Sequence, residues 1–297
     1  MSDEGASWEP VVEETADALT PAVAAAMHGL LDAPGAPPGP GDPVPLLWHW
    51  LTFLPRTPQR DLGPDGHPRP GSFLPPASGR RMFAGGQVSR GDRDLRVGEE
   101  LARRSVVTGV REKTGRSGSL VFVTVNHELS GRDGLSVTDV QDIVYRPPAP
   151  PPSAASAAPA ANPTPAAPTA DIGGAGGDGD DGWDWGLDLR PDPTLLFRFS
   201  ALTYNAHRIH YDRTYATEVE GYPGLVVHGP LQAIALAELC RRNVPGRPLR
   251  TFRFRAVSPA FDGRPLRFRG RWTDDDQVTL VALDDTGVTT MEADATL

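Results

Sequence analysis

The chain has 297 residues and a formal net charge of -9 at pH 7. This length suits one large domain or two ordinary ones, and the acidic balance excludes nucleic acid and anionic membranes as expected partners. Cys240 is the sole cysteine, which excludes a disulfide framework and a thiolate zinc site; with no apolar run of the roughly 20 residues that span a bilayer, we expect a cytoplasmic protein.

The first part of the chain is predicted to hold two helices followed by three strands. Residues 11–31 are rich in Ala and Leu, which predicts a helix that Pro21 begins or kinks. The apolar residues 46–54 predict a short buried helix. Residues 101–111, 119–129 and 135–146 show β-branched alternation, with a turn at 113–118, and therefore predict three consecutive antiparallel strands.

The composition changes sharply after residue 146. Residues 147–187 are dominated by Pro, Ala, Ser and Gly and then by acidic residues, so they cannot bury enough apolar surface to offset the entropy of ordering. We therefore expect a disordered linker between a unit at 1–146 and a unit at 188–297. Near its end, Trp183 and Trp185 are equally compatible with docking on a folded surface and with exposure.

The second part repeats a similar order of elements. A strand is predicted at 195–200, followed by a polar loop, and an apolar helix at 231–239 with Pro230 in its first turn. Strands are then predicted at 251–256, 265–273, 278–283 and 288–297. A sheet wrapped around one buried helix, present twice, is the simplest assembly, which is an α+β fold with two similar layers.

Reactive groups are concentrated in the loop that begins at Phe199. This loop carries the amide of Asn205, the imidazoles of His207 and His210, and the guanidinium of Arg208. Taken alone, such a histidine-rich loop is more often a solvated connector or a hydrogen-bonded corner than a catalytic site. Gly229, which opens the predicted helix, strengthens the catalytic interpretation, because free N–H groups at a helix start suit a developing thioester enolate.

These segments resemble a known family. Residues 199–212 and 219–230 resemble the hydratase signature of MaoC-like dehydratases, most closely the branch called hydroxyacyl-thioester dehydratase type 2. Segments of the first part, at 47–54, 74–76, 80–86, 115–118, 120–125 and 141–145, resemble its N-terminal dehydratase-like domain. The resemblance implies a double hotdog fold, with two antiparallel sheets each wrapped around a central helix, a non-catalytic first unit and a catalytic second unit.

The resemblance also implies a departure in the catalytic loop. Many MaoC-like hydratases pair an aspartate with a histidine five residues later, whereas Asn205 and His210 occupy these positions here. Hydration of an enoyl thioester needs a base, an acid and a donor to the carbonyl oxygen. His210 can serve as base and then as acid, Asn205 can hold the water but cannot take its proton, and the N–H of Gly229 can stabilise the oxyanion. His207 is expected either to transfer a proton or to orient the water.

A second group of residues is expected to contact the substrate. They are Arg80, Arg81, Arg208, Tyr204 and His228. A guanidinium suits a carboxylate or a phosphate, although solvated arginines or ion pairs with Asp212 and Glu220 explain the same residues. His228 also has a purely structural interpretation, as a residue that shapes the turn before the helix.

The expected function is reversible hydration of an enoyl-CoA to a 3-hydroxyacyl-CoA. The resemblance favours a branched dicarboxylic acyl-CoA such as 3-methylfumaryl-CoA (mesaconyl-C4-CoA) or itaconyl-CoA, with citramalyl-CoA as product. A medium-chain thioester on CoA or on carrier protein is the alternative within the same chemistry.

Three other functions are compatible with parts of the sequence. A hotdog thioesterase would need a carboxylate near the central helix, for which Glu238 is the candidate. A non-catalytic acyl-binding module is disfavoured by the reactive loop. A zinc site built from His207, His210 and Asp212 lacks a second ligand cluster, so no metal and no cofactor are expected. The partner is an acyl-CoA substrate, and the fold allows a homodimer.

Overall fold

The structure is a computed structural model that describes residues 8–69, 71, 73–77, 79–115, 118–146 and 182–297. Most of the predicted linker, residues 147–181, lies outside the described residues. Among the helices formed by the described ranges, none combines the length and apolar composition needed to cross a bilayer.

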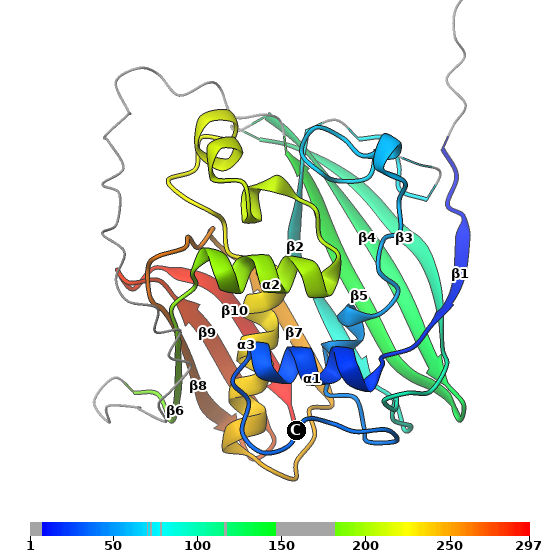
Figure 1. Cartoon of the computed structure of the whole chain (residues 1–297), viewed down its shortest axis with the longest axis vertical. Helices are drawn as coiled ribbons and strands as arrows, with labels where there is room; N and C mark the ends of the chain where they lie inside the picture. The colour runs from blue at the N-terminus through cyan, green and yellow to red at the C-terminus, as the bar shows by residue number, and fades with distance from the viewer. Residues whose placement is uncertain (1–7, 70, 72, 78, 116–117, 147–181) are drawn as a thin grey trace, which may run out of the picture.

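The strands form one antiparallel sheet with a repeated topology (Figure 1). The strands of the first half are β1 (Val12–Asp17), β2 (Arg80–Arg90), β3 (Leu101–Gly115), β4 (Gly118–Gly131) and β5 (Gly134–Arg146). Those of the second half are β6 (Trp185–Leu189), β7 (Thr251–Ala256), β8 (Leu266–Asp274), β9 (Gln277–Leu283) and β10 (Thr289–Thr296). The order β1-β3-β4-β5-β2 in the first half recurs as β6-β8-β9-β10-β7 in the second, and β2 pairs with β7 where the halves meet. The predicted α+β fold with a duplicated unit is confirmed.

Two adjacent glycines allow the halves to join. Gly85 and Gly86 lie on β2, between its neighbours β5 and β7. A Cβ atom on Gly85 would lie 2.5 Å from the carbonyl oxygen of Phe254, and one on Gly86 would lie 2.3 Å from that of Val140. Side chains at both positions are therefore excluded by backbone on either side of the strand.

The helices α1 (Pro21–Leu30), α2 (Pro193–Thr203) and α3 (Gly229–Asn243) lie on one face of the sheet, as Figure 1 shows. Every residue from 231 to 240 of α3 is buried, so this helix is the core of the second half. These buried residues occupy all sides of the helix, and α3 packs on all five strands of the second half, β6 to β10. α1 and α2 pack against each other in front of it.

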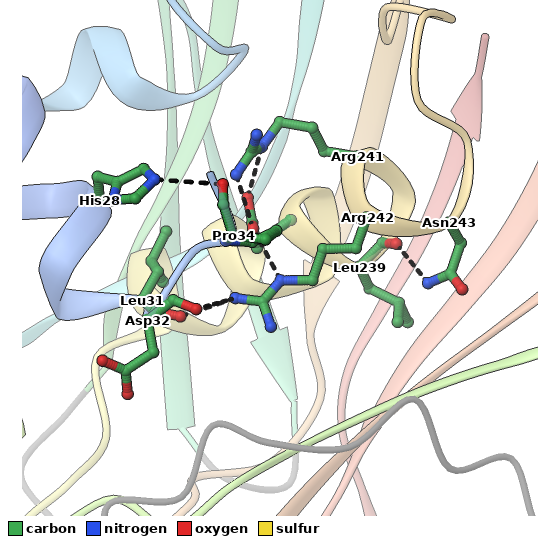
Figure 2. A network of polar contacts seen from close by, with 9 residues as sticks. His28, Leu31, Asp32, Pro34, Leu239, Arg241, Arg242 and Asn243 are labelled. Atoms are coloured by element: carbon green, nitrogen blue, oxygen red, sulfur yellow. Dashed lines mark hydrogen bonds and ion pairs between the residues drawn. The ribbon is translucent and has the colours of Figure 1, made fainter. Parts of the chain in front are cut away.

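A polar network joins α3 to the first half (Figure 2). The carboxylate of Glu238, which is buried, accepts hydrogen bonds from Nε of Arg241 at 2.7 Å and from Nε of Arg242 at 2.8 Å. Arg242 also donates to the carbonyl oxygen of Leu31, directly after α1, at 2.7 Å. The predicted thioesterase carboxylate is thus engaged in holding the two halves together.

The sequence-based assignments were wrong at two places. Residues 11–31 do not form one helix: β1 pairs with β3, and α1 begins only at Pro21, where the Oγ1 of Thr20 caps the N–H of Val23. The predicted strand at 195–200 is instead helix α2, whose start is capped by Asp192 with Pro193 in the first turn. Strand β2 was not predicted, whereas the strands of residues 101–146 and the four C-terminal strands were.

The end of the predicted linker also differs from the expectation. Strand β6 begins at Trp185 and pairs with β8, so the last three residues assigned to the linker belong to the sheet. Trp185 is buried and its ring contacts that of Trp272 edge to face, with centroids 5.2 Å apart. Docking of this tryptophan on the folded second half is therefore the correct alternative.

Candidate active site

A deep cleft lies between the two halves. Its volume is about 2320 Å³, larger than the roughly 300–1,000 Å³ of pockets for drug-sized ligands. The first half contributes the segment 59–69 and the start of β2, and the second half contributes the loop 203–211 and the start of α3. The predicted site residues that line it are Asn205, His207, His210, Gly229, Arg80, Arg81 and Tyr204. A space of this volume is large enough for an acyl-CoA thioester.

His210 is held in one tautomer by the backbone. Its Nδ1 lies 2.7 Å from the carbonyl oxygen of Val226, which can only accept, so Nδ1 carries the proton and Nε2 carries a lone pair. Burial lowers the pKa of His210 to about 4, although the hydrogen bond to Val226 opposes this shift. The ring is therefore neutral at neutral pH, with Nε2 available as a proton acceptor.

His228 lies behind His210 and does not face the cleft. Its side chain is 0% exposed, its ring stacks on that of His210 with centroids 3.7 Å apart, and its Nε2 lies 2.9 Å from Oγ of Ser200. Burial holds the pKa of His228 well below its ordinary value. The rings of His210 and Phe199 pack against the ring of His228. The prediction that His228 contacts the substrate is therefore wrong, because the residue does not line the cleft.

The amide of Asn205 shapes the start of the reactive loop. Helix α2 ends at Thr203, and the next residue, Tyr204, adopts a left-handed conformation with φ of 50° and is exposed at the rim of the cleft. The Oδ1 of Asn205 then accepts a hydrogen bond from the backbone N–H of His207 at 3.0 Å. The amide NH₂ donates to no other residue in the part of the chain that the structure describes, but no atom of an amide can take a proton from water.

His207 contacts a residue that the sequence did not connect with it. Its ring lies against that of His67, from the first half, with centroids 4.0 Å apart, and 5.4 Å from that of His210. His67 is not among the site residues expected from the sequence. Burial, together with the neighbouring His67 and His210, lowers the pKa of His207 to about 2.

Asp65 completes this group of side chains. Its Oδ2 lies 3.0 Å from Nδ1 of His67, and its Oδ1 accepts from the backbone N–H of His67 at 3.1 Å. Burial alone would raise the pKa of Asp65, but the hydrogen bonds and the charge of His67 outweigh it and hold the pKa at about 2. An ionised carboxylate therefore lies next to the imidazoles at the cleft.

The segment that carries Asp65 and His67 docks directly on the reactive loop. The backbone N–H of Arg208 donates to the carbonyl oxygen of Asp65 at 2.8 Å, and its guanidinium donates to that of Pro64 at 3.0 Å. Gly66, with φ of +89°, lies so close that a Cβ there would be 1.8 Å from the carbonyl oxygen of Ala206. The two halves are in backbone contact at the site itself.

The three arginines expected to bind an anion have different surroundings. Arg208 is paired with Asp212 at 2.7 Å and does not line the cleft, and Arg80 is paired with Glu220 at 2.6 Å. The ion-pair explanation of these two residues is the one that the structure shows. The guanidinium of Arg81 has no hydrogen-bond or ion-pair partner within the described ranges; burial lowers its pKa, while the charge of Asp65 opposes this shift.

Gly229 lies where backbone N–H groups reach the cleft. It is the first residue of α3, and a Cβ atom on it would lie 2.9 Å from Cδ1 of Phe83 on β2. Its own N–H donates to no other residue that the structure describes. A free N–H at the positive end of a buried helix can stabilise a developing negative charge on oxygen.

Two clusters of polar side chains at the cleft are held together by their own hydrogen bonds. Donor atoms of Asp65, His67 and His207 lie within 4.8 Å of one another, which is a spacing that a metal ion could bridge. However, Asp65 and His67 already bond each other. In the first half, His49 and Trp50 lie in a short 3₁₀ helix (Trp48–Leu51) and both donate to the buried carboxylate of Asp139, at 3.1 and 2.7 Å, which anchors this helix to β5.

Comparison with known proteins identifies the family. The model of "Hydroxyacyl-thioester dehydratase type 2" matches residues 47–262. The mesaconyl-C(4)-CoA hydratase of Chloroflexus aurantiacus is 42% identical over 97% of this chain and 95% of that protein. The chain belongs to the hydroxyacyl-thioester dehydratase type 2 family. It is accordingly an enzyme of the hydratase and dehydratase class.

Solved structures of distant members of the fold agree with this architecture. HtdX of Mycobacterium tuberculosis aligns with a TM-score of 0.65 at 18% identity, over 97% of this hydroxyacyl-thioester dehydratase type 2 chain and all (100%) of that chain. A second protein of that organism, described as having a double hotdog fold, aligns with a TM-score of 0.56 at 16% identity, over 99% and 97% of the two chains. The fold of this family member is thus the double hotdog.

Proposed function

We propose that this chain catalyses the reversible hydration of mesaconyl-C4-CoA, or of a closely similar enoyl-CoA that carries a free carboxylate. In that substrate the alkene is conjugated to the thioester, and the carboxylate is attached to the β-carbon. Water adds its oxygen to the β-carbon and a proton is added to the α-carbon, which yields citramalyl-CoA.

The catalytic roles follow from the atoms that face the cleft. His210 is the proposed base, because Nε2 carries a lone pair and Nδ1 is fixed by Val226. Asn205 is proposed to hold the water through its free NH₂ group. The N–H of Gly229 is proposed to bind the thioester oxygen as the enolate forms, in the manner of an oxyanion hole.

The observation that carries the choice of substrate is the guanidinium of Arg81, which has no hydrogen-bond or ion-pair partner among the residues that the structure describes. A partly buried charge without a partner is destabilising, so such a charge in a cleft suits a ligand of opposite sign. The charge of Arg81 also acts on His207 and on Asp65, which locates it near the reacting groups. A carboxylate on the β-carbon would be close to the water that attacks that carbon.

Hydrolysis of the thioester is the second candidate, and the structure gives it less support. Glu238, the carboxylate that it would need, is bound to Arg241 and Arg242 and does not line the cleft. A non-catalytic acyl-binding module would have no need of the buried, tautomer-fixed imidazole of His210.

The proposal retains several predictions from the sequence. The first unit at 1–146 and a second unit beginning at β6 share the substrate cleft, and the protein acts in the cytoplasm. Cys240 is buried as a free thiol, as a reducing compartment allows. A homodimer stays a prediction.

The proposal is tested with purified protein and a panel of enoyl-CoA thioesters. Loss of the enoyl-thioester absorbance without release of free CoA, and with gain of one water in the product, is the expected result for mesaconyl-C4-CoA. Release of free CoA would show a thioesterase instead. A wholly unreactive protein that still binds acyl-CoA would show a binding module.

A further inference from the structure

We propose that His67, held by Asp65, is a catalytic proton-transfer residue of the hydration, and that this pair from the first half supplies the carboxylate that Asn205 lacks in the second half. The inference rests on the proposed hydration. It also revises the expectation that the first unit is non-catalytic.

The geometry of the pair resembles a carboxylate-supported imidazole. The carboxylate of Asp65 accepts from Nδ1 of His67 at 3.0 Å, which leaves Nε2 as the nitrogen that can exchange a proton with substrate. Both side chains line the cleft and both are partly exposed to it, with side-chain exposures of 22% for His67 and 31% for Asp65. The ring of His67 packs on His207, which in turn contacts His210.

The reaction can be divided between two groups of this kind. When the oxygen of water bonds to the β-carbon, His210 takes one proton of the water and the alkene electron pair moves towards the thioester carbonyl. The α-carbon then needs a proton, which either protonated His210 or a second acid can supply, since the amide of Asn205 and the neutral ring of His207 are too weakly acidic for this role. His67 in its doubly protonated form, stabilised by ionised Asp65, donates that proton. The proton on His210 returns to His67 through solvent after product release, so the protons balance.

The position of the pair depends on specific docking. Asp65 is fixed to the reactive loop by the bond from the backbone N–H of Arg208, and Gly66 allows the close approach to Ala206. A surface loop that only covered the cleft would not need backbone hydrogen bonds to the residue that follows His207. The docking therefore holds His67 in a fixed position relative to His207 and His210.

The test compares substitutions at the pair with a matched histidine elsewhere. His67→Gln keeps a donor for Asp65 but cannot transfer a proton, and Asp65→Asn keeps the turn but removes the charge. With mesaconyl-C4-CoA, we expect kcat to fall by roughly 10²–10⁴-fold in His67→Gln and by a smaller factor in Asp65→Asn, with KM changed little in either. His28→Gln should match the parent, because His28 lies on α1 outside the lining of the cleft, with its ring next to the carbonyl oxygen of Pro34 (Figure 2).

Two further measurements separate catalysis from structure. Free imidazole should partly restore turnover to His67→Ala, because it can enter the space and transfer a proton, and thermal unfolding should be similar in all variants. Parent-like kcat in His67→Gln overturns the inference alone, as does a loss in His67→Ala that imidazole does not relieve. Loss of parent turnover in EDTA with recovery in Zn²⁺ would show a metal site instead. A parent protein that hydrates no enoyl thioester overturns the proposed function, and with it this inference.

Discussion

The Nδ1 atom of His210 lies 2.7 Å from the carbonyl oxygen of Val226, the residue that leads into the start of α3. This contact places the proton of the imidazole on Nδ1, and Nε2 is left with a lone pair. The same strand-like segment therefore positions both the proposed base and, through Gly229, the proposed oxyanion donor.

His210→Ala should lower kcat by roughly 10²–10⁴-fold, the usual effect of losing a general acid–base group. The N–H of Gly229 and the amide of Asn205 remain, so binding of the thioester and KM should change little. Steady-state kinetics with mesaconyl-C4-CoA measures both constants. Full activity in His210→Ala together with an inactive His207→Ala would transfer the role of base to His207.

The stability of the protein should depend on the protonation of His210. Its pKa is about 4 in the folded chain and 6.5 in the reference state, so the unfolded chain binds a proton below pH 6.5 that the folded chain does not bind until about pH 4. Stability from this group is therefore complete above pH 6.5 and is lost as the pH falls towards 4.

At about 1.36 kcal/mol per pKa unit, the loss from this group between pH 7 and pH 5 is on the order of 2 kcal/mol. His210→Gln should lack this part of the pH dependence, whereas the contributions of other buried histidines such as His127 are common to both proteins. Urea unfolding at pH 7 and pH 5 measures the difference. Equal pH dependence in the two proteins would show that the ring is not buried in its neutral form.

The contact of Gly66 with the reactive loop should be essential for activity. Gly66→Ala places a methyl group where the carbonyl oxygen of Ala206 lies, in addition to the strain of a positive φ. Displacement of the segment by about 1 Å can lower turnover by roughly 10²-fold. Gly35→Ala is the matched control, because Gly35 has φ of +78° and open space around it. Comparable kcat in the two variants would argue against a docked segment.

Glu238 should be important for stability and not for turnover. Glu238→Gln removes the charge that pairs with Arg241 and Arg242, and breaking such a buried ion pair typically destabilises a protein by about 3 kcal/mol. The exposed pair of Arg255 and Glu292 provides the control, since Glu292→Gln should change stability by less than about 1 kcal/mol. Lost turnover at unchanged stability would support the thioesterase alternative.

Much of the fold could be predicted from the sequence where the pattern is local. The strands of residues 101–146 alternate clearly, and Pro230 marks the start of the buried helix. The helix α2 was mistaken for a strand because Leu195, Leu196 and Phe199 are apolar in a short run. The capping residue Asp192 followed by Pro193 is the local signal that would have given the correct assignment.

The part of the site that could not be predicted is made by contacts between distant segments. The motif Pro64-Asp65-Gly66-His67 reads locally as an ordinary turn, and nothing within it indicates that it docks on Ala206 and His207. In the same way, the sequence alone does not distinguish between the three arginines that were expected to bind an anionic group of the substrate. Only the ion pairs of Arg80 and Arg208 distinguish them from Arg81.

The central claim, that the substrate carries a carboxylate bound by Arg81, is tested most directly by one ratio. This ratio is kcat/KM for mesaconyl-C4-CoA divided by kcat/KM for crotonyl-CoA, which lacks the carboxylate. A charged hydrogen bond contributes roughly 1.5–3 kcal/mol, so the ratio should fall about 10- to 100-fold in Arg81→Gln and stay at the parent value in Arg255→Gln. A parent protein that prefers crotonyl-CoA, or a ratio unchanged in Arg81→Gln, would contradict the claim.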